Sequence, residues 1–192
     1  MLFRSTGSSI TVNKATLTIT ADNKSKIYGD AVPALTATYF GFMNGETLAT
    51  SGITGQLQLS TEVTKASGAG VYDILANGSA LASGNYNLVI NNGSFVVRKA
   101  TIVVTAENKS RFYGTANPEF TASYAGFVNG ESLATSGVYG VPAMSTLATE
   151  TSDIGQYTIS TTNGSLGAAN YSFSLVNGSQ IGRATRLNSS HT

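Results

Sequence analysis

The chain has 192 residues, a formal net charge of +1 and 11% charged residues, with no cysteine and one histidine, His191, next to the C-terminal residue. Lysine and arginine are scattered, so the sequence has no basic patch of the kind that binds nucleic acid. The absence of cysteine and the position of the histidine argue against thiol chemistry, a Ser-His-Asp triad and Cys- or His-based metal sites.

The N-terminal segment has no feature of a membrane or export signal. No apolar run approaches the roughly 18 residues of a membrane-spanning helix, and MLFRSTGSSI lacks the apolar centre of a signal peptide. We expect any export signal to lie outside this sequence. Residues 7–16, GSSITVNKAT, echo residues 93–101, GSFVVRKAT. Residues 1–13 are therefore predicted to be the tail of a preceding module.

Short alternating segments follow in chain order. Residues 16–21, TLTITA, alternate apolar residues with threonines, as a half-buried strand does. Residues 22–30, DNKSKIYGD, are polar and predict a connection with one buried aromatic residue, Tyr28. Residues 34–42, ALTATYFGF, alternate again and predict the next strand.

The rest of this stretch gives more strands and turns. Asn44-Gly45 is a turn dipeptide, and GETLAT after it predicts at most a single helical turn. Strands are expected at 56–61, 71–75, 85–90 and 94–99. The last two are predicted to form a hairpin about Asn92-Gly93.

The whole pattern is then repeated 85 residues later. YFGFMNGETLATSG begins at Tyr39, and YAGFVNGESLATSG begins at Tyr124, with 11 of 14 positions identical. Internal repetition at a fixed period indicates an array of similar modules. We predict repeats at 14–98 and 99–183, and a disordered or non-native tail at 184–192.

Six or seven short strands per repeat, at a spacing of about 8–12 residues, are expected of a sandwich or barrel. The predicted fold is thus all-β, with two tandem Ig-like β-sandwich modules of about 85 residues. The alternative is a β-grasp-like module with one short helix, which requires GETLAT to extend.

The repeated residues resemble the bacterial MBG domain of the YGX type. In the second repeat these are Tyr113-Gly114, Asn117-Pro118, the stretch from Tyr124 to Glu131, Gly155-Gln156-Tyr157-Thr158-Ile159 and Asn170-Tyr171. The first repeat departs from the pattern in having Val32-Pro33 in place of Asn-Pro. The resemblance implies Ig-like repeats that recur in large secreted or surface-attached bacterial proteins, including filamentous-haemagglutinin-like adhesins. It implies no catalytic residues.

Four pairs of tyrosines recur in both repeats and have two interpretations: Tyr28/Tyr113, Tyr39/Tyr124, Tyr72/Tyr157 and Tyr86/Tyr171. They could form an aromatic platform for sugars. We favour core packing, with each hydroxyl bonded to the backbone at the rim, because the tyrosines alternate with other apolar residues. Tyr139 stands where the first repeat has Thr54, which predicts a surface or edge residue.

Acidic residues recur at two places. Asp22/Glu107 with Asn23/Asn108, and Asp30 nearby, could offer oxygen ligands to Ca²⁺, but the spacing of a calcium loop is missing and a solvated turn is preferred. Glu46/Glu131 follow the Asn-Gly turns and are predicted to cap free N–H groups. A glycosidase carboxylate pair is disfavoured because the motif is duplicated.

The sequence disfavours two further chemistries. A Lys-Asn isopeptide bond would use Lys14/Lys99 with Asn85/Asn170, but lysines at strand starts are usually solvated. The Asn-Gly-Ser sites at Asn77, Asn92 and Asn163 are interpreted as turns and not as glycan acceptors.

We therefore predict a non-enzymatic structural protein with no catalytic, cofactor-binding or metal-binding residues and no cofactor. It would be a spacer or stalk repeat of a bacterial secreted or cell-surface adhesin-like protein that projects a distal binding domain. The alternative is that the modules themselves bind host or cell-surface glycan or protein. Neighbouring repeats of the same chain are the expected partners, without nucleic acid or membrane insertion, and the expected location is extracellular.

Overall fold

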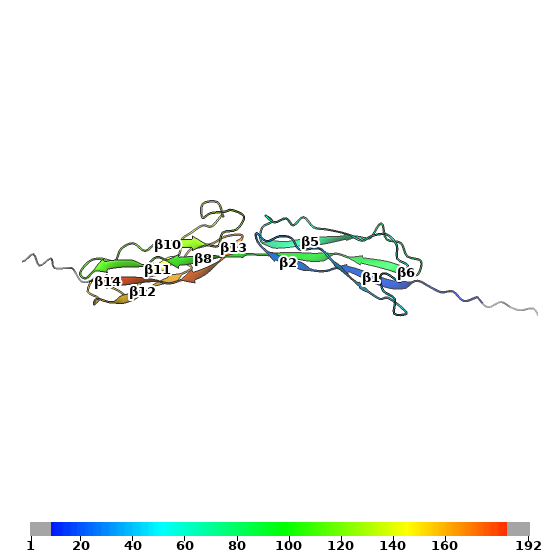
Figure 1. The fold of residues 1–192 in the computed structure, drawn as a ribbon, viewed down its shortest axis with the longest axis horizontal. Helices are drawn as coiled ribbons and strands as arrows, with labels where there is room; N and C mark the ends of the chain where they lie inside the picture. Colours follow the sequence, from blue (N-terminus) through cyan, green and yellow to red (C-terminus); the bar gives the residue numbers. More distant parts are fainter. Residues whose placement is uncertain (1–8, 184–192) are drawn as a thin grey trace, which may run out of the picture. The chain divides into compact units, whose positions relative to one another are not determined.

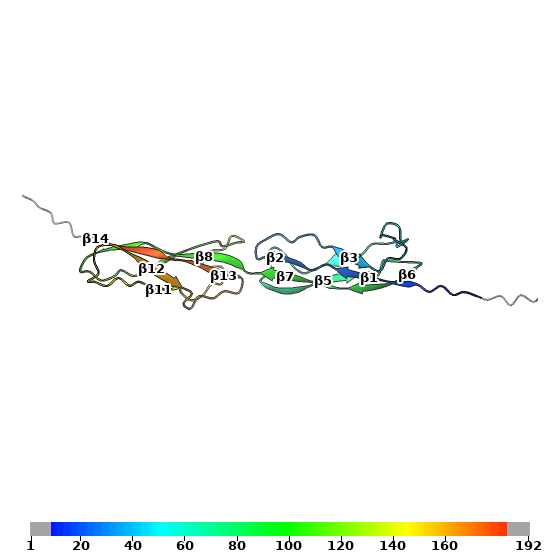
Figure 2. The same cartoon turned by 90° about the horizontal axis from the view of Figure 1, so that it is seen from below.

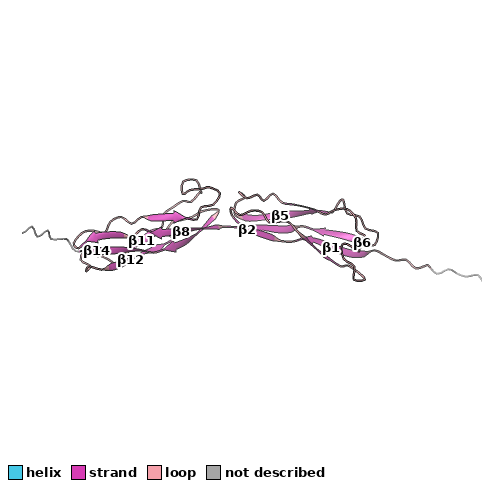
Figure 3. Ribbon diagram, in the orientation of Figure 1, coloured by secondary structure: helices cyan, strands magenta, loops and turns pink. Residues whose placement is uncertain are grey.

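The computed structural model describes residues 9–183, and the expectations for residues 1–8 and 184–192 lie outside this part. The described part is all-β: it has fourteen strands and no helix (Figure 3). Its contacts divide it into two compact units. The first contains residues 9–25, 32–64 and 71–96, and the second contains residues 26–31, 65–70 and 97–183. Two segments of the first sequence repeat, 26–31 and 65–70, therefore belong to the second unit.

The first sequence repeat forms seven strands: β1 (Ala15–Ala21), β2 (Lys24–Ile27), β3 (Ala37–Phe40), β4 (Gln58–Ser60), β5 (Gly70–Asn77), β6 (Tyr86–Asn91) and β7 (Gly93–Arg98). They form two sheets, one with the order β3-β1-β6 and one with the order β2-β7-β5-β4 (Figure 1, Figure 2). β1 runs antiparallel to β3 and parallel to β6.

The second sequence repeat forms the same arrangement from β8 (Ala100–Ala106), β9 (Lys109–Phe112), β10 (Ala122–Ala125), β11 (Ala143–Ser145), β12 (Gln156–Thr162), β13 (Tyr171–Val176) and β14 (Gly178–Arg183). Its sheets have the orders β10-β8-β13 and β11-β12-β14-β9. β8 is parallel to β13, and β9 is parallel to β14. The prediction of two tandem all-β modules is confirmed.

The alternation along β1 explains its place in the core. Leu17, Ile19 and Ala21 are buried, while the threonines between them lie on the other face. Successive side chains of a strand point to opposite faces, so a strand with one apolar face buries that face and leaves the other to solvent. Ile74 on β5 and Phe95 on β7 are also fully buried. The predicted strand at 16–21 is thus confirmed with its buried face.

Two predictions about the chain path are wrong. Residues 22–30 are not only a connection, because Lys24–Ile27 form β2. Residues 85–99 are not a hairpin: β6 joins the sheet of β1, and β7 joins the sheet of β5. The chain changes sheets at Asn92, where Gly93 lies so close to the backbone that a Cβ would stand 2.5 Å from the Ala21 carbonyl oxygen. The Asn92-Gly93 pair therefore allows two backbone segments to approach closely and does not form a tight hairpin turn.

The segment GETLAT forms turns and no helix. The Thr47 N–H donates to Thr50 Oγ1 at 2.8 Å, and the Ser51 N–H donates to the Thr47 carbonyl at 2.9 Å. The β-grasp-like alternative required a helix at this point. Residues 9–183 contain none, so that alternative is not supported.

At one completely buried position the first repeat has an apolar residue and the second repeat has a polar one. Phe95 on β7 corresponds to Gln180 on β14, and both are completely buried. Gln180 Nε2 donates to Asn117 Oδ1 at 2.6 Å, while Gln180 Oε1 has no partner in the described residues. Asn117 corresponds to Val32. The polar residues Asn117 and Gln180 of the second repeat therefore take the positions that the apolar residues Val32 and Phe95 have in the first.

This exchange leads to a testable prediction. We expect Asn117→Val to destabilise the second unit, because it leaves the Nε2 group of the completely buried Gln180 without its acceptor. The double variant with Gln180→Phe should recover this loss, with a coupling free energy of about 0.5–3 kcal/mol. Urea unfolding of the four proteins of the double-mutant cycle measures the coupling. Strictly additive effects would contradict it.

Candidate functional site

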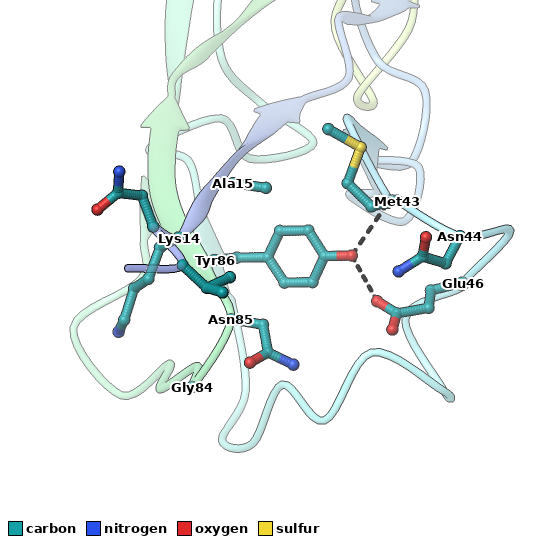
Figure 4. A pocket seen from close by; sticks show the side chains of 10 residues that line it. Lys14, Ala15, Met43, Asn44, Glu46, Gly84, Asn85 and Tyr86 are labelled. Atoms are coloured by element: carbon teal, nitrogen blue, oxygen red, sulfur yellow. Dashed lines mark hydrogen bonds between the residues drawn. The ribbon is translucent and has the colours of Figure 1, made fainter. Parts of the chain in front are cut away.

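A hollow of about 390 Å³ lies at one end of β1 and β6 in the first unit (Figure 4). Its lining consists of Val12, Asn13, Lys14, Ala15, Met43, Asn44, Glu46, Gly84, Asn85 and Tyr86. Figure 4 shows the Tyr86 ring at its centre, with the hydroxyl directed towards Met43 and Glu46. We call this group the Tyr86 hollow.

Local structure places the polar groups of the Tyr86 hollow. Tyr86 is the first residue of β6 and lies opposite Ala15 of β1 in the parallel ladder. Asn44 and Gly45 both have positive φ, 54° and 72°, and the Glu46 N–H donates to the Met43 carbonyl at 2.9 Å. Positive φ at both central positions is the requirement that Asn-Gly meets most readily. The predicted turn is confirmed, and it brings Glu46 to the tyrosine.

The Tyr86 hydroxyl has two partners. It donates to Glu46 Oε2 and accepts the Met43 N–H at 3.0 Å. The same arrangement recurs in the second unit, where the Tyr171 hydroxyl donates to Glu131 Oε2 at 2.6 Å and accepts the Val128 N–H at 3.1 Å. Each repeat thus contains one buried tyrosine that donates to a glutamate of the same repeat.

The second unit adds a third group to this arrangement. The Tyr28 hydroxyl donates to Glu131 Oε1 at 2.6 Å, so that both carboxylate oxygens of Glu131 accept a phenol. The Tyr28 ring meets the Tyr171 ring edge to face, with centroids 5.6 Å apart. A carboxylate is a strong acceptor, so hydrogen bonds to it are worth about 1.5–3 kcal/mol each.

The surroundings raise the pKa values of these tyrosines. Burial, and then the hydrogen bond to Glu131, raise the pKa of Tyr171 to about 12. For Tyr86 the hydrogen bond to Glu46 is the main cause of a raised pKa, and for Tyr28 the hydrogen bond to Glu131. A phenolate would repel the neighbouring carboxylate and lose its donated bond, which is why the neutral form is favoured.

The raised pKa of Tyr171 predicts a defined alkaline behaviour. The folded state favours the neutral phenol, so its stabilisation is complete below pH 10 and is lost as the pH rises through about 12. We expect an ultraviolet titration of the tyrosines to show a late phenolate step near pH 12. Tyr171→Phe should remove that step alone. A wild-type titration that is complete by about pH 11 would contradict the assignment.

The recurrent tyrosines differ in their burial. Tyr86 and Tyr171 are buried, as the core interpretation predicts, whereas Tyr39, Tyr124, Tyr72 and Tyr157 are half-buried. Tyr28 is 5% exposed but Tyr113 is 53% exposed, so core packing is wrong for Tyr113. Tyr139 is 68% exposed, which confirms its prediction as a surface residue.

Asp22 and Glu107 are bonded to threonines. Asp22 accepts the hydroxyls of Thr36 and Thr38, and these bonds are the main reason for its lowered pKa. Glu107 accepts the Thr121 hydroxyl and lies 3.3 Å from Lys109 Nζ, and its pKa is lowered as well. Residues 9–183 contain no group of three or more His, Asp or Glu side chains that could hold a metal ion.

The capping role predicted for Glu46 and Glu131 is wrong. Their carboxylates accept phenol hydroxyls instead. The N–H groups of the following turns are met by the hydroxyls of Thr50 and Thr135. Sequence reasoning missed the tyrosine partner, although Glu46 and Tyr86 recur together with the same separation of 40 residues as Glu131 and Tyr171.

Lys14 and Lys99 are exposed, as their solvated interpretation predicts. Their ammonium groups donate to the carbonyls of Ser83 and Ala168, both at 2.8 Å. Among the Asn-Gly-Ser sites, Asn77 is the last residue of β5, and its side chain accepts the Ser79 N–H at 2.9 Å where the turn at Ser79-Ala80 begins. Asn92 accepts the Ala76 N–H at 2.9 Å at the change of sheets.

These features define a class of protein: tandem all-β repeats, each with one tyrosine-glutamate pair. The model of the MBG domain family (YGX type) matches residues 17–96 and again residues 102–179. The chain therefore belongs to the MBG domain family of the YGX type, as the resemblance predicted. No match was found among curated proteins. None of the described residues forms a helix that could cross a membrane.

Proposed function

We propose that this chain is a spacer or stalk segment of a bacterial secreted or cell-surface adhesin-like protein. In this proposal the repeats carry tension and hold a distal binding domain away from the cell, and they perform no reaction. Membership of a family of tandem repeats supports it. The observation that carries it is the direction in which the strands of each repeat are paired.

The first strand of each repeat is parallel to the next-to-last strand. β1 and β6 are paired from Ala15↔Tyr86 to Thr20↔Asn91, and β8 and β13 are paired in the same way. β6 leads directly into β7, which ends the repeat. A pull on the chain before β1 and after β7 therefore draws two parallel strands in opposite directions along their length.

This direction of loading determines mechanical resistance. In parallel strands the hydrogen bonds are evenly spaced along the ladder. A force along the strands loads all of these bonds at once, whereas a force across them breaks one after another. The pairing thus gives each repeat the resistance to stretching that a stalk requires.

The experiment uses two pairs of cysteine handles, since the chain has no natural cysteine. Lys14→Cys with Asn91→Cys pulls β1 and β6 along their length, and Lys14→Cys with Asn85→Cys pulls the same strands apart from one end. In single-molecule force spectroscopy we expect the first pair to unfold at a force several-fold higher. Equal forces for the two pairs would overturn the mechanical proposal.

One observation favours the second candidate function, binding of a glycan or protein. Tyr72, Asp73 and Glu62 line one hollow of the first repeat. The equivalent hollow of the second repeat has Tyr157, Thr158 and Leu147, so the carboxylates are found in the first repeat alone. An aromatic ring beside carboxylates suits the hydroxyl groups of a sugar. A glycan array tests this: binding that is lost in Asp73→Asn would favour recognition over a passive spacer.

A further inference from the structure

The Tyr-Gly dipeptide occurs in equivalent loops of both repeats, with opposite surroundings. Tyr28 is 5% exposed because its ring and hydroxyl are held in the second unit by Tyr171 and Glu131. Tyr113 is 53% exposed. Both loops begin with the same backbone bond, from Tyr28 N–H to the Arg98 carbonyl and from Tyr113 N–H to the Arg183 carbonyl. The tyrosine of this loop is therefore buried in the first repeat and exposed in the second.

The residues that receive Tyr28 recur in the Tyr86 hollow. Tyr171, Glu131 and Val128 correspond to Tyr86, Glu46 and Met43, each 85 residues earlier. In the second unit Glu131 bonds one tyrosine through each oxygen. Glu46 bonds Tyr86 through Oε2, and its Oε1 has no hydrogen-bond partner among residues 9–183. The Tyr86 hollow thus has the receiving groups of the second unit without the received tyrosine.

A second contact shows the same relation. In the second unit the Ala69 N–H donates to Asn170 Oδ1 at 3.0 Å. The corresponding donor is the N–H of Ile154, whose side chain is 61% exposed, and the corresponding acceptor is the exposed Asn85. Asn85 is one of the residues that line the Tyr86 hollow. Two independent contacts of the second unit therefore have counterparts that are not made. Their donors, Tyr113 and Ile154, lie in the second repeat, and their acceptors, Glu46 and Asn85, line the Tyr86 hollow.

Glycine is required at the point of closest approach. A Cβ on Gly29 would stand 2.6 Å from the Cβ of Val128, so only glycine lets this loop approach Val128 so closely. Gly114 retains this property beside Tyr113, and no atom lies within 4 Å of its Cβ position. The flexible Met43 takes the place of Val128. The exposed loop thus has a glycine at the position where the Tyr28 loop makes its closest approach to Val128.

We propose that the Tyr86 hollow binds the Tyr113-Gly114 loop of a second copy of this chain. The incoming hydroxyl would donate to Glu46 Oε1, its ring would meet Tyr86 edge to face, and the Ile154 N–H would donate to Asn85. Each copy has one hollow and one loop, so the contact is heterologous and copies add head to tail. This inference goes beyond the spacer function and does not depend on it.

The test is sedimentation velocity of the full chain over a concentration series up to about 1 mM, because a contact of one aromatic ring and two hydrogen bonds is weak. We expect the sedimentation coefficient of wild type to rise continuously with concentration. Tyr113→Ala and Glu46→Ala should each remain monomeric. An equimolar mixture of the two should stop at a dimer, because it has one intact loop and one intact hollow.

Two further variants protect the test against a misfolded hollow. Asn85→Ala changes an exposed side chain, and Tyr113→Phe keeps the ring but removes the hydroxyl. We expect Tyr113→Phe to weaken association about tenfold or more, because it loses a hydrogen bond to a carboxylate. A wild type that stays monomeric at about 1 mM, or association that survives Tyr113→Ala unchanged, would overturn the proposal. Neither outcome of this association test changes the unfolding forces that we expect for the two pairs of cysteine handles.

Discussion

Replacing Phe95 by alanine is expected to lower the free energy of unfolding of the first unit by about 3–5 kcal/mol. Phe95 lies on β7, is completely buried, and is among the largest side chains of the core. Truncation removes its apolar contacts and leaves a cavity that a sheet on either side cannot fill by collapse. Such a loss is a large part of the stability of a small domain.

Phe40→Ala provides the matched control. It removes the same side chain from β3, but Phe40 is 79% exposed. We expect a change within about 0.5 kcal/mol. Urea unfolding monitored by tyrosine fluorescence suits the chain, which has nine tyrosines and no tryptophan. Similar losses in the free energy of unfolding for Phe95→Ala and Phe40→Ala would contradict the placement of Phe95 in the core.

Gly55→Ala is expected to lower the free energy of unfolding by about 2–5 kcal/mol. Gly55 has φ of +84°, and a Cβ there would lie 1.9 Å from the carbonyl oxygen of Ala80. The left-handed backbone contributes about 1–2 kcal/mol to the cost. The forced displacement contributes about 1–3 kcal/mol more, since it disturbs the paired bonds between Thr54 and Ala82.

Gly52→Ala separates these two contributions. Gly52 also has positive φ, +68°, but no atom lies within 4 Å of its Cβ position. Only the backbone cost of about 1–2 kcal/mol is expected there. The difference between the two variants in urea unfolding measures the steric part. If Gly52→Ala cost as much as Gly55→Ala, the close approach to Ala80 would be of no importance.

The alternation of apolar residues predicted much of the fold. The threonine-rich strand at 16–21 and its counterpart at 101–106 both form with their apolar faces buried. The repeat predicted two similar modules, because equal residues at equal spacing meet equal local constraints. The Asn44-Gly45 turn also followed from sequence, since its dihedral angles demand residues that tolerate positive φ.

The pairing of strands could not be predicted in the same way. Periodicity shows which face of β6 is apolar, but not which strand lies beside it. Proximity in sequence favoured a hairpin of β6 and β7, whereas β6 pairs with β1 across the whole repeat. β2 was missed because KSKI has only one apolar residue in four, and its buried position is taken by Lys26.

The candidate site was missed for a related reason. Identical letters at Tyr28 and Tyr113 suggested identical burial. Their exposure differs because it depends on what lies against each loop, which local sequence does not encode. The Glu46–Tyr86 bond joins residues 40 apart, and a capping role for Glu46 needed only its neighbours. Local reasoning therefore preferred the wrong partner.

The parallel pairing of β1 with β6 also has consequences for folding kinetics. Partners in this ladder are 71 residues apart, so β1 cannot complete its sheet until nearly the whole repeat has been synthesised. Folds dominated by such distant contacts fold slowly, because loop closure comes before most of the gain. During that interval TLTITA is unpaired, and the similar TIVVTA of the next repeat competes for the same neighbour. The sequence differences between these two strands would then help each repeat to fold with its own partner instead of exchanging strands.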